Sequence, residues 1–180
     1  MNGLRLDDIR INVVVIIFIV VLGFAVGLQQ FFHKKMVIEP VYQAFASIEG
    51  VEGVELKERD GMIVLTLSLA DVEHLHTVAA KISSAAARFS QPFQILIKDQ
   101  PNETLKAAYE QMHFALEQGI ATGYFVEMAE RIEELALKHK VDFALRIDGS
   151  YVYLQLHDGG HYLYQIVSRR DQPLIARLES

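Results

Sequence analysis

The first strong pattern along the chain is an uninterrupted apolar segment near its N-terminus. Residues 11–28 contain a single polar side chain, Asn12, and no charge. A helix of this length spans roughly 27 Å, close to the ~30 Å hydrocarbon core of a bilayer, and residues 29–32 add an interfacial turn. The pattern predicts a transmembrane helix over residues 11–32, preceded by a short N-terminal tail of residues 1–10. A buried core helix and a cleaved signal peptide are the alternatives, but the segment has neither the polar stripe of the first nor a clear cleavage site for the second.

Residues 40–98 show both periodicities of globular secondary structure. Pro40 is suited to the first turn of a helix, and Asp60-Gly61 is a hairpin signal between two alternating stretches. A run of apolar residues at helical spacing follows Asp71, which is placed to cap that helix. The segment "PFQILIKD" then has the composition of a strand. The predicted order of elements is α-β-β-α-β.

This order resembles the ring-building modules of secretion and sporulation assemblies. The resemblance lies in the order of elements over residues 40–98 and includes no shared motif. It implies that this segment packs against its copy in a neighbouring subunit.

Residues 102–168 predict a different arrangement. Asn102 is placed to cap a helix that ends at Gly119, and a second helix follows Gly123. The stretches "VDFALRI", "SYVYLQLH" and "HYLYQIVSR" are strands joined by glycine-containing turns. These residues therefore predict two helices followed by a three-stranded antiparallel meander, and the tail to the C-terminus has no clear pattern. The chain as a whole is predicted to be a single transmembrane helix followed by one α+β domain, residues 33–180.

The charge of this domain restricts its partners. The chain has a net charge of −6, and its first 32 residues carry two basic and two acidic side chains, so the domain retains all of the net charge. Nucleic acid and anionic lipid headgroups need a basic surface, which argues against both as main partners. The short linker "HKKMVIE" predicts that the acidic domain lies close to the bilayer. The chain has no cysteine, which excludes disulfides, thiolate catalysis and cysteine-bound metals.

The basic residues on the two sides of the predicted helix do not decide its orientation in the membrane. Arg5 and Arg10 precede the predicted helix, and Lys34 and Lys35 follow it, so the count of basic residues is nearly balanced. A short tail before the span is typical of a bacterial anchor with its N-terminus inside. This reading predicts an extracytoplasmic C-terminal domain.

The chain lacks the common phosphate-loop, dinucleotide-binding, nucleophile-elbow and zinc-protease motifs, so the remaining candidates for catalytic chemistry are His157 and His161. If Asp158 to Gly160 form a three-residue loop, the two imidazoles face each other and one ion can bridge them. If the turn has two residues, Asp158 pairs with His161 and the histidines separate. A zinc site needs at least a third protein ligand, and none can be named. We therefore predict no cofactor, no metal and no catalytic residue. A metal-dependent enzyme built on the two histidines and an acid such as Asp148 is the third-ranked alternative.

Two other patterns indicate contact surfaces. In the two-residue register, four tyrosines lie on one face of the last hairpin, where they form either an inner face covered by helices or a face that binds a partner. They are Tyr151, Tyr153, Tyr162 and Tyr164. Gly23 and Gly27 form a G-x-x-x-G motif within the apolar span, which permits close contact between helices. The leading interpretation is a membrane-anchored, non-enzymatic interaction or assembly module with a protein partner or a second copy of itself. The alternative is a membrane-anchored sensory domain whose tyrosine face receives a small ligand.

Overall fold

The computed structural model describes residues 15–24, 38–59, 62–90, 92–169 and 175–177. Residues 15–24 form a helix whose large apolar side chains are 50–69 % exposed. Within the described ranges, no helix is both long enough and apolar enough to cross a membrane. Most of the predicted span, including Gly27, lies outside the described residues, so the transmembrane helix stays a prediction.

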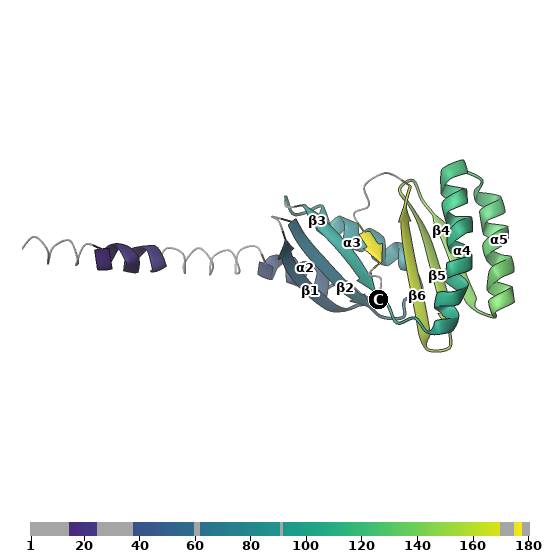
Figure 1. The fold of residues 1–180 in the computed structure, drawn as a ribbon, viewed down its shortest axis with the longest axis horizontal. Helices are drawn as coiled ribbons and strands as arrows, with labels where there is room; N and C mark the ends of the chain where they lie inside the picture. Colours follow the sequence, from purple (N-terminus) through teal and green to yellow (C-terminus); the bar gives the residue numbers. More distant parts are fainter. Residues whose placement is uncertain (1–14, 25–37, 60–61, 91, 170–174, 178–180) are drawn as a thin grey trace, which may run out of the picture. The chain divides into compact units, whose positions relative to one another are not determined.

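The α+β fold predicted from the sequence is confirmed. By compactness the chain divides into Met1–Val41 and Tyr42–Ser180. The first group of elements has the expected order α-β-β-α-β (Figure 1) and comprises α2 (Glu39–Ala46), β1 (Val51–Arg59), β2 (Met62–Leu69), α3 (Leu75–Ala86) and β3 (Phe93–Lys98). The second group is the expected pair of helices and antiparallel strands, with a short additional strand, and comprises α4 (Glu103–Thr122), α5 (Phe125–His139), β4 (Asp142–Ile147), β5 (Tyr151–Asp158), β6 (His161–Ser168) and β7 (Ile175–Arg177).

The strands form two sheets. The first is mixed and has the order β1-β2-β3-β7, in which β2 pairs antiparallel with β1 and parallel with β3. Its inward positions on β2 are the alternating residues that predicted the strand, Ile63, Leu65 and Leu67, and all three are buried. The second sheet is the predicted meander β4-β5-β6.

Helices α4 and α5 cover one face of the second sheet. Their apolar stripes join the alternating residues Val152, Leu154, Leu156 and Leu163 in one buried cluster. The other face of this sheet carries the tyrosines. The two faces of β5 therefore serve different parts of the core, which is why residues 152–156 of this strand are all buried.

Two local expectations were wrong, and one strand was not predicted. Asp71 does not cap α3, which begins at Leu75 with His74 at its N-cap position and no side-chain cap. Helix α4 passes through Gly119 and ends at Thr122, where Gly123 adopts the left-handed conformation with φ 76°. The tail that showed no pattern supplies β7, which pairs parallel with β3.

Candidate functional site

The last hairpin takes the two-residue register. Asp158 pairs with His161 and His157 pairs with Tyr162, so His157 and His161 lie on opposite faces of the sheet. Of the two turn glycines only Gly159 has a positive φ, 61°, which is the type II′ pattern.

The two histidines have separate partners. His157 lies with its Nε2 atom 2.9 Å from Asp71 Oδ1, whereas the Nδ1 atom of His161 is 3.3 Å from the carbonyl oxygen of Gln100. Within the part of the chain that the structure describes, no three histidine or acidic side chains are grouped so that they could hold a metal ion. The structure thus does not bring together the residues considered for a metal centre.

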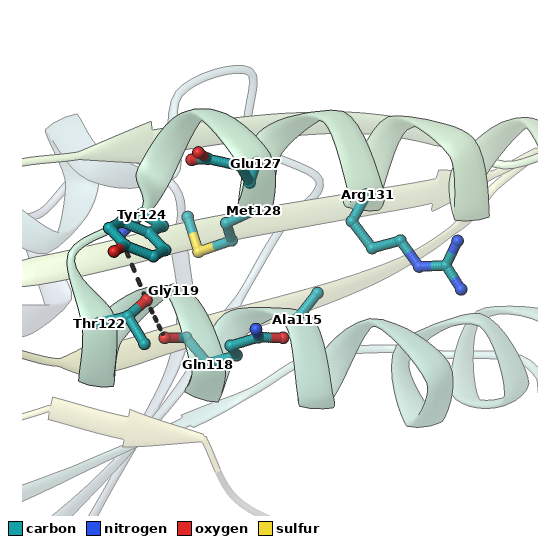
Figure 2. A pocket seen from close by; sticks show the side chains of 8 residues that line it. All are labelled: Ala115, Gln118, Gly119, Thr122, Tyr124, Glu127, Met128 and Arg131. Atoms are coloured by element: carbon teal, nitrogen blue, oxygen red, sulfur yellow. Dashed lines mark hydrogen bonds between the residues drawn. The ribbon is translucent and has the colours of Figure 1, made fainter.

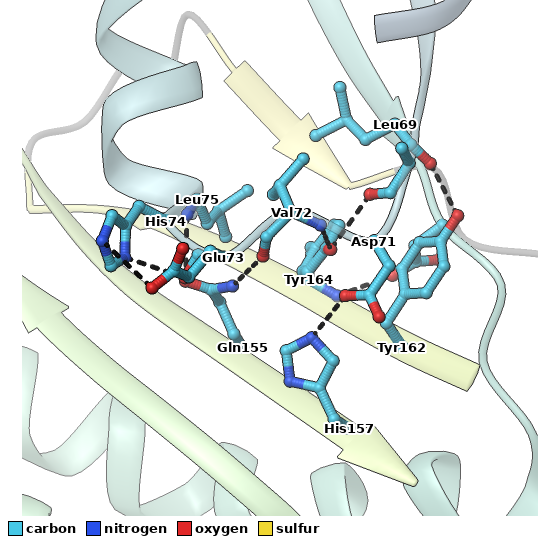
Figure 3. Close-up of polar contacts among 12 residues, drawn as sticks. Leu69, Asp71, Val72, Glu73, His74, Leu75, Gln155, His157, Tyr162 and Tyr164 are labelled. Atoms are coloured by element: carbon cyan, nitrogen blue, oxygen red, sulfur yellow. Dashed lines mark hydrogen bonds and ion pairs between the residues drawn. The ribbon is translucent and has the colours of Figure 1, made fainter. Parts of the chain in front are cut away.

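The tyrosine face of the second sheet is buried against another part of the same chain. Tyr153, Tyr162 and Tyr164 are at most 4 % exposed, and Tyr151 is half-buried. The segment that covers this face is residues 69–75, the end of β2 and the connection to α3, hereafter the β2–α3 segment (Figure 3).

Two phenol groups bind the backbone of the first half of this segment. The hydroxyl of Tyr162 donates a 2.7 Å hydrogen bond to the carbonyl oxygen of Leu69. The hydroxyl of Tyr164 accepts a 2.7 Å bond from the backbone N–H of Val72 and donates a 3.0 Å bond to the carbonyl oxygen of Ala70. The rings of the two tyrosines stack with centroids 5.0 Å apart. Side chains of the second sheet therefore satisfy three backbone groups of this connection.

Gln155 binds the second half of the segment. It is 3 % exposed, its Nε2 atom donates a 2.9 Å bond to the carbonyl oxygen of Val72, and its Oε1 atom accepts a 2.9 Å bond from the N–H of Leu75. Leu75 is the first residue of α3, and the first N–H groups of a helix have no partner within the helix. Because His74 provides no side-chain cap, Gln155 caps α3 from a strand 80 residues away in the sequence.

The electrostatics of this contact keep the phenols protonated. Burial raises the pKa of Tyr164 well above its ordinary value, the nearby carboxylates of Asp71 and Asp99 raise it further, and the bond from Val72 lowers it. Burial and the hydrogen bond to Asp148 likewise raise the pKa of Tyr153. A neutral phenol is a donor as well as an acceptor, and Tyr164 uses both capacities on the β2–α3 segment.

Asp148, considered above as an acid for an enzyme, binds the turn between β4 and β5. Its Oδ1 atom accepts bonds of 2.7 Å and 2.8 Å from the N–H groups of Ser150 and Tyr151, and its Oδ2 atom accepts a 2.7 Å bond from the hydroxyl of Tyr153. Partial burial raises the pKa of this carboxyl, but these three bonds and the charge of Arg169 outweigh that effect, so the pKa lies below its ordinary value of 3.8.

A lowered carboxyl pKa predicts a loss of stability in acid. The ionised form of Asp148 is favoured by folding, so its contribution is fully present above about pH 5 and is lost as the pH falls through the pKa of the folded state. We expect Asp148→Asn to be less stable than the unsubstituted chain at pH 7 and the difference to shrink below pH 3.8. Urea unfolding followed by circular dichroism at pH 7 and pH 3 measures this, and a difference that stays constant would contradict the assignment.

A different surface emerges on the α4–α5 hairpin, and the sequence patterns did not single it out. Among the described residues of 42–180, four large apolar side chains are more than 60 % exposed, and all four belong to this hairpin or its turn: Phe114, Tyr124, Val126 and Leu137. They lie outside the buried stripes of α4 and α5. The sequence did contain a signal for this surface, because these apolar residues occur at positions outside the apolar stripes of the two helices.

A groove runs between the outer sides of α4 and α5. It contains a cavity of about 310 Å³ lined by Phe114. A second cavity, of about 150 Å³, is lined by Tyr124 (Figure 2). The two cavities share Ala115, Gln118 and Arg131 as lining residues, so they lie next to each other. We call this the α4–α5 groove.

Comparison with known proteins adds no assignment: no protein-family model matches this chain, and neither the curated proteins nor the solved structures include a significant match. The function must therefore be argued from the geometry of the chain itself.

Proposed function

We propose that this protein is a membrane-anchored, non-enzymatic interaction or assembly module that presents the α4–α5 hairpin to a protein partner. The observation that carries the proposal is the concentration of exposed apolar side chains on that hairpin, between 64 % and 75 % exposed. Two of these side chains, Phe114 and Tyr124, line the α4–α5 groove, and exposed apolar groups beside a groove are typical of protein-binding surfaces.

The tyrosine face has a different role in this proposal. Because Tyr162, Tyr164 and Gln155 bind the β2–α3 segment, they fix the second sheet to the first group of elements. This contact gives the hairpin a rigid support, and rigid placement of a binding surface reduces the entropy lost on association. Membrane anchoring rests on the apolar run of residues 11–28, with the domain on the extracytoplasmic side.

Cross-linking of the full chain in membranes tests the proposal. We expect the chain to be captured as dimers, larger species or a complex with another protein, and we expect Gly23→Ile together with Gly27→Ile to reduce self-association through the span several-fold. Ala25→Ile is the matched control, because a regular helix places that position on another side. A chain that stays monomeric in membranes and co-purifies with no partner would refute the proposal.

A small-ligand-binding function is the second candidate. The tyrosine face is filled, but a cavity of about 400 Å³ lies beside the β2–α3 segment and is lined by polar groups such as Asp71, His74, Thr77 and Lys81. A ligand bound there would raise the melting temperature of the monomeric chain. A thermal-shift screen of small metabolites, with Thr77→Ala as a control variant, therefore distinguishes ligand binding from assembly.

A further inference from the structure

Helix α5 carries a stripe of charges with alternating sign. Its members are spaced by four, three and four residues, which returns to the same side of a helix, and all four are exposed: Glu127, Arg131, Glu134 and Lys138. We call this the charge stripe. It borders the α4–α5 groove, because Glu127 and Arg131 line it and Nζ of Lys138 donates a 2.9 Å bond to Gln111 of α4 across it.

The charges along the stripe run negative, positive, negative, positive. In the reverse direction each position has the opposite sign, so the stripe is complementary to a reversed copy of itself. Two copies of α5 aligned antiparallel about a point between residues 132 and 133 place Glu127 opposite the second copy's Lys138, and Arg131 opposite the second copy's Glu134. The two-fold axis repeats each pair, which makes four ion pairs. A parallel alignment would instead place each charge opposite its own kind.

We infer that the partner of the α4–α5 hairpin is a second copy of this chain, bound by antiparallel contact between the two α5 helices over the α4–α5 groove. The inference rests on the proposed function and specifies its partner. A two-fold contact uses the same patch on both subunits, so that patch must be self-complementary, and the charge stripe has this property. The exposed rings of Phe114 and Tyr124 beside the stripe supply the apolar area that ion pairs alone do not provide.

The ion pair inside the charge stripe of one copy does not prevent pairing with a second copy. Arg131 and Glu134 form a 2.8 Å ion pair in which the two side chains are 61 % and 66 % exposed. An exposed pair of this kind contributes little to the stability of its own helix. Either side chain can therefore turn to a partner across the interface.

Charge reversal tests the alignment. In Glu127→Lys and in Lys138→Glu, each expressed as the full chain in mild detergent, the reversed charge meets a like charge twice per dimer, so we expect self-association to weaken about tenfold or more. When the two variants are mixed, every opposed pair is again opposite in sign, so a heterodimer should form with the original affinity.

The double variant Glu127→Lys with Lys138→Glu provides the internal control. Within one helix it keeps both new repulsions, because the introduced lysine lies four residues from Arg131 and the introduced glutamate lies four residues from Glu134. Between antiparallel copies it restores attraction. Recovered association in the double variant is expected and can come only from contact between chains.

Disulfide formation between introduced cysteines tests the α5 contact separately from any contact through the membrane span. The chain has no cysteine of its own, so only the introduced thiols can form the bond. Mixed Glu127→Cys and Lys138→Cys chains should oxidise to a heterodimer. Either variant alone should not cross-link, because its two thiols would be separated by eleven residues, about 16 Å along the helices. Circular dichroism confirms that each variant is folded.

The outcomes separate this inference from the proposed function. If the full chain associates but all charge variants associate equally, or the mixture does not recover, the α5 contact is wrong while the assembly function remains. Cross-linking of Glu127→Cys alone would replace the antiparallel contact with a parallel one and also overturn the inference. If the unsubstituted chain is monomeric and captures no partner, both fail.

Discussion

Gln155→Leu is expected to lower the free energy of unfolding by about 2–4 kcal/mol. The substitution keeps the size of the side chain but removes the partners of two buried backbone groups, the carbonyl of Val72 and the N–H of Leu75. Leaving a buried donor or acceptor without its partner costs about 1–3 kcal/mol for each group. Denaturant unfolding of the full chain, followed by circular dichroism, measures the change.

Gln94→Leu is the matched control for this prediction. Gln94 also lies in a strand, but it is exposed, so the same substitution should change stability by no more than about 0.5 kcal/mol. If both variants lose the same free energy of unfolding, the loss comes from replacing glutamine by leucine in a strand, and the role assigned to Gln155 is wrong. The comparison therefore measures the contact between the second sheet and the β2–α3 segment.

This contact also marks the limit of what the sequence could predict. The strand β2 and the helices α4 and α5 were predicted because their apolar positions repeat within a short window. The composition of the tyrosine face followed from the alternation of β5 and β6 once the turn had two residues. All of these features depend on neighbours along the chain.

The features that were missed depend on partners far away in the sequence. Tyr164 and the N–H of Val72 are separated by 92 residues, and no local pattern indicates which backbone a buried phenol will bind. Asp71 has the character of a helix cap, but His157 lies beside it and α3 starts later. The strand β7 has only three residues, too few to show alternation, and exists through its pairing with β3.

The use of the tyrosine face within the chain changes where a partner is sought. A row of tyrosines on a sheet is consistent with an inner face or with a binding face, and sequence alone does not distinguish them. Since Tyr153, Tyr162 and Tyr164 are buried, the exposed apolar groups of the α4–α5 hairpin become the better candidates for external contact. The support of that hairpin therefore matters for function as well as for stability.

Gly119→Val is expected to destabilise the chain by about 2–3 kcal/mol through the packing of α4 against α5. Glycine inside a helix costs about 1 kcal/mol relative to alanine, so its presence needs a reason. A Cβ atom at position 119 would lie 2.7 Å from Cβ of Met128 and 2.5 Å from its sulfur. The first of these atoms is fixed to the backbone of α5, so the two helices would have to move apart, and overpacking of this kind costs about 1–3 kcal/mol.

Ala107→Val provides the control on the same helix. Position 107 is exposed, so a branched side chain there should cost only the difference in helix propensity, about 0.5 kcal/mol. Thermal and denaturant unfolding of both variants in the full chain measures the two effects. If α4 and α5 carry the contact between copies, Gly119→Val should also weaken self-association, whereas Ala107→Val should not. If the two variants are equally stable, α4 and α5 do not approach each other so closely at position 119 that a glycine is needed there.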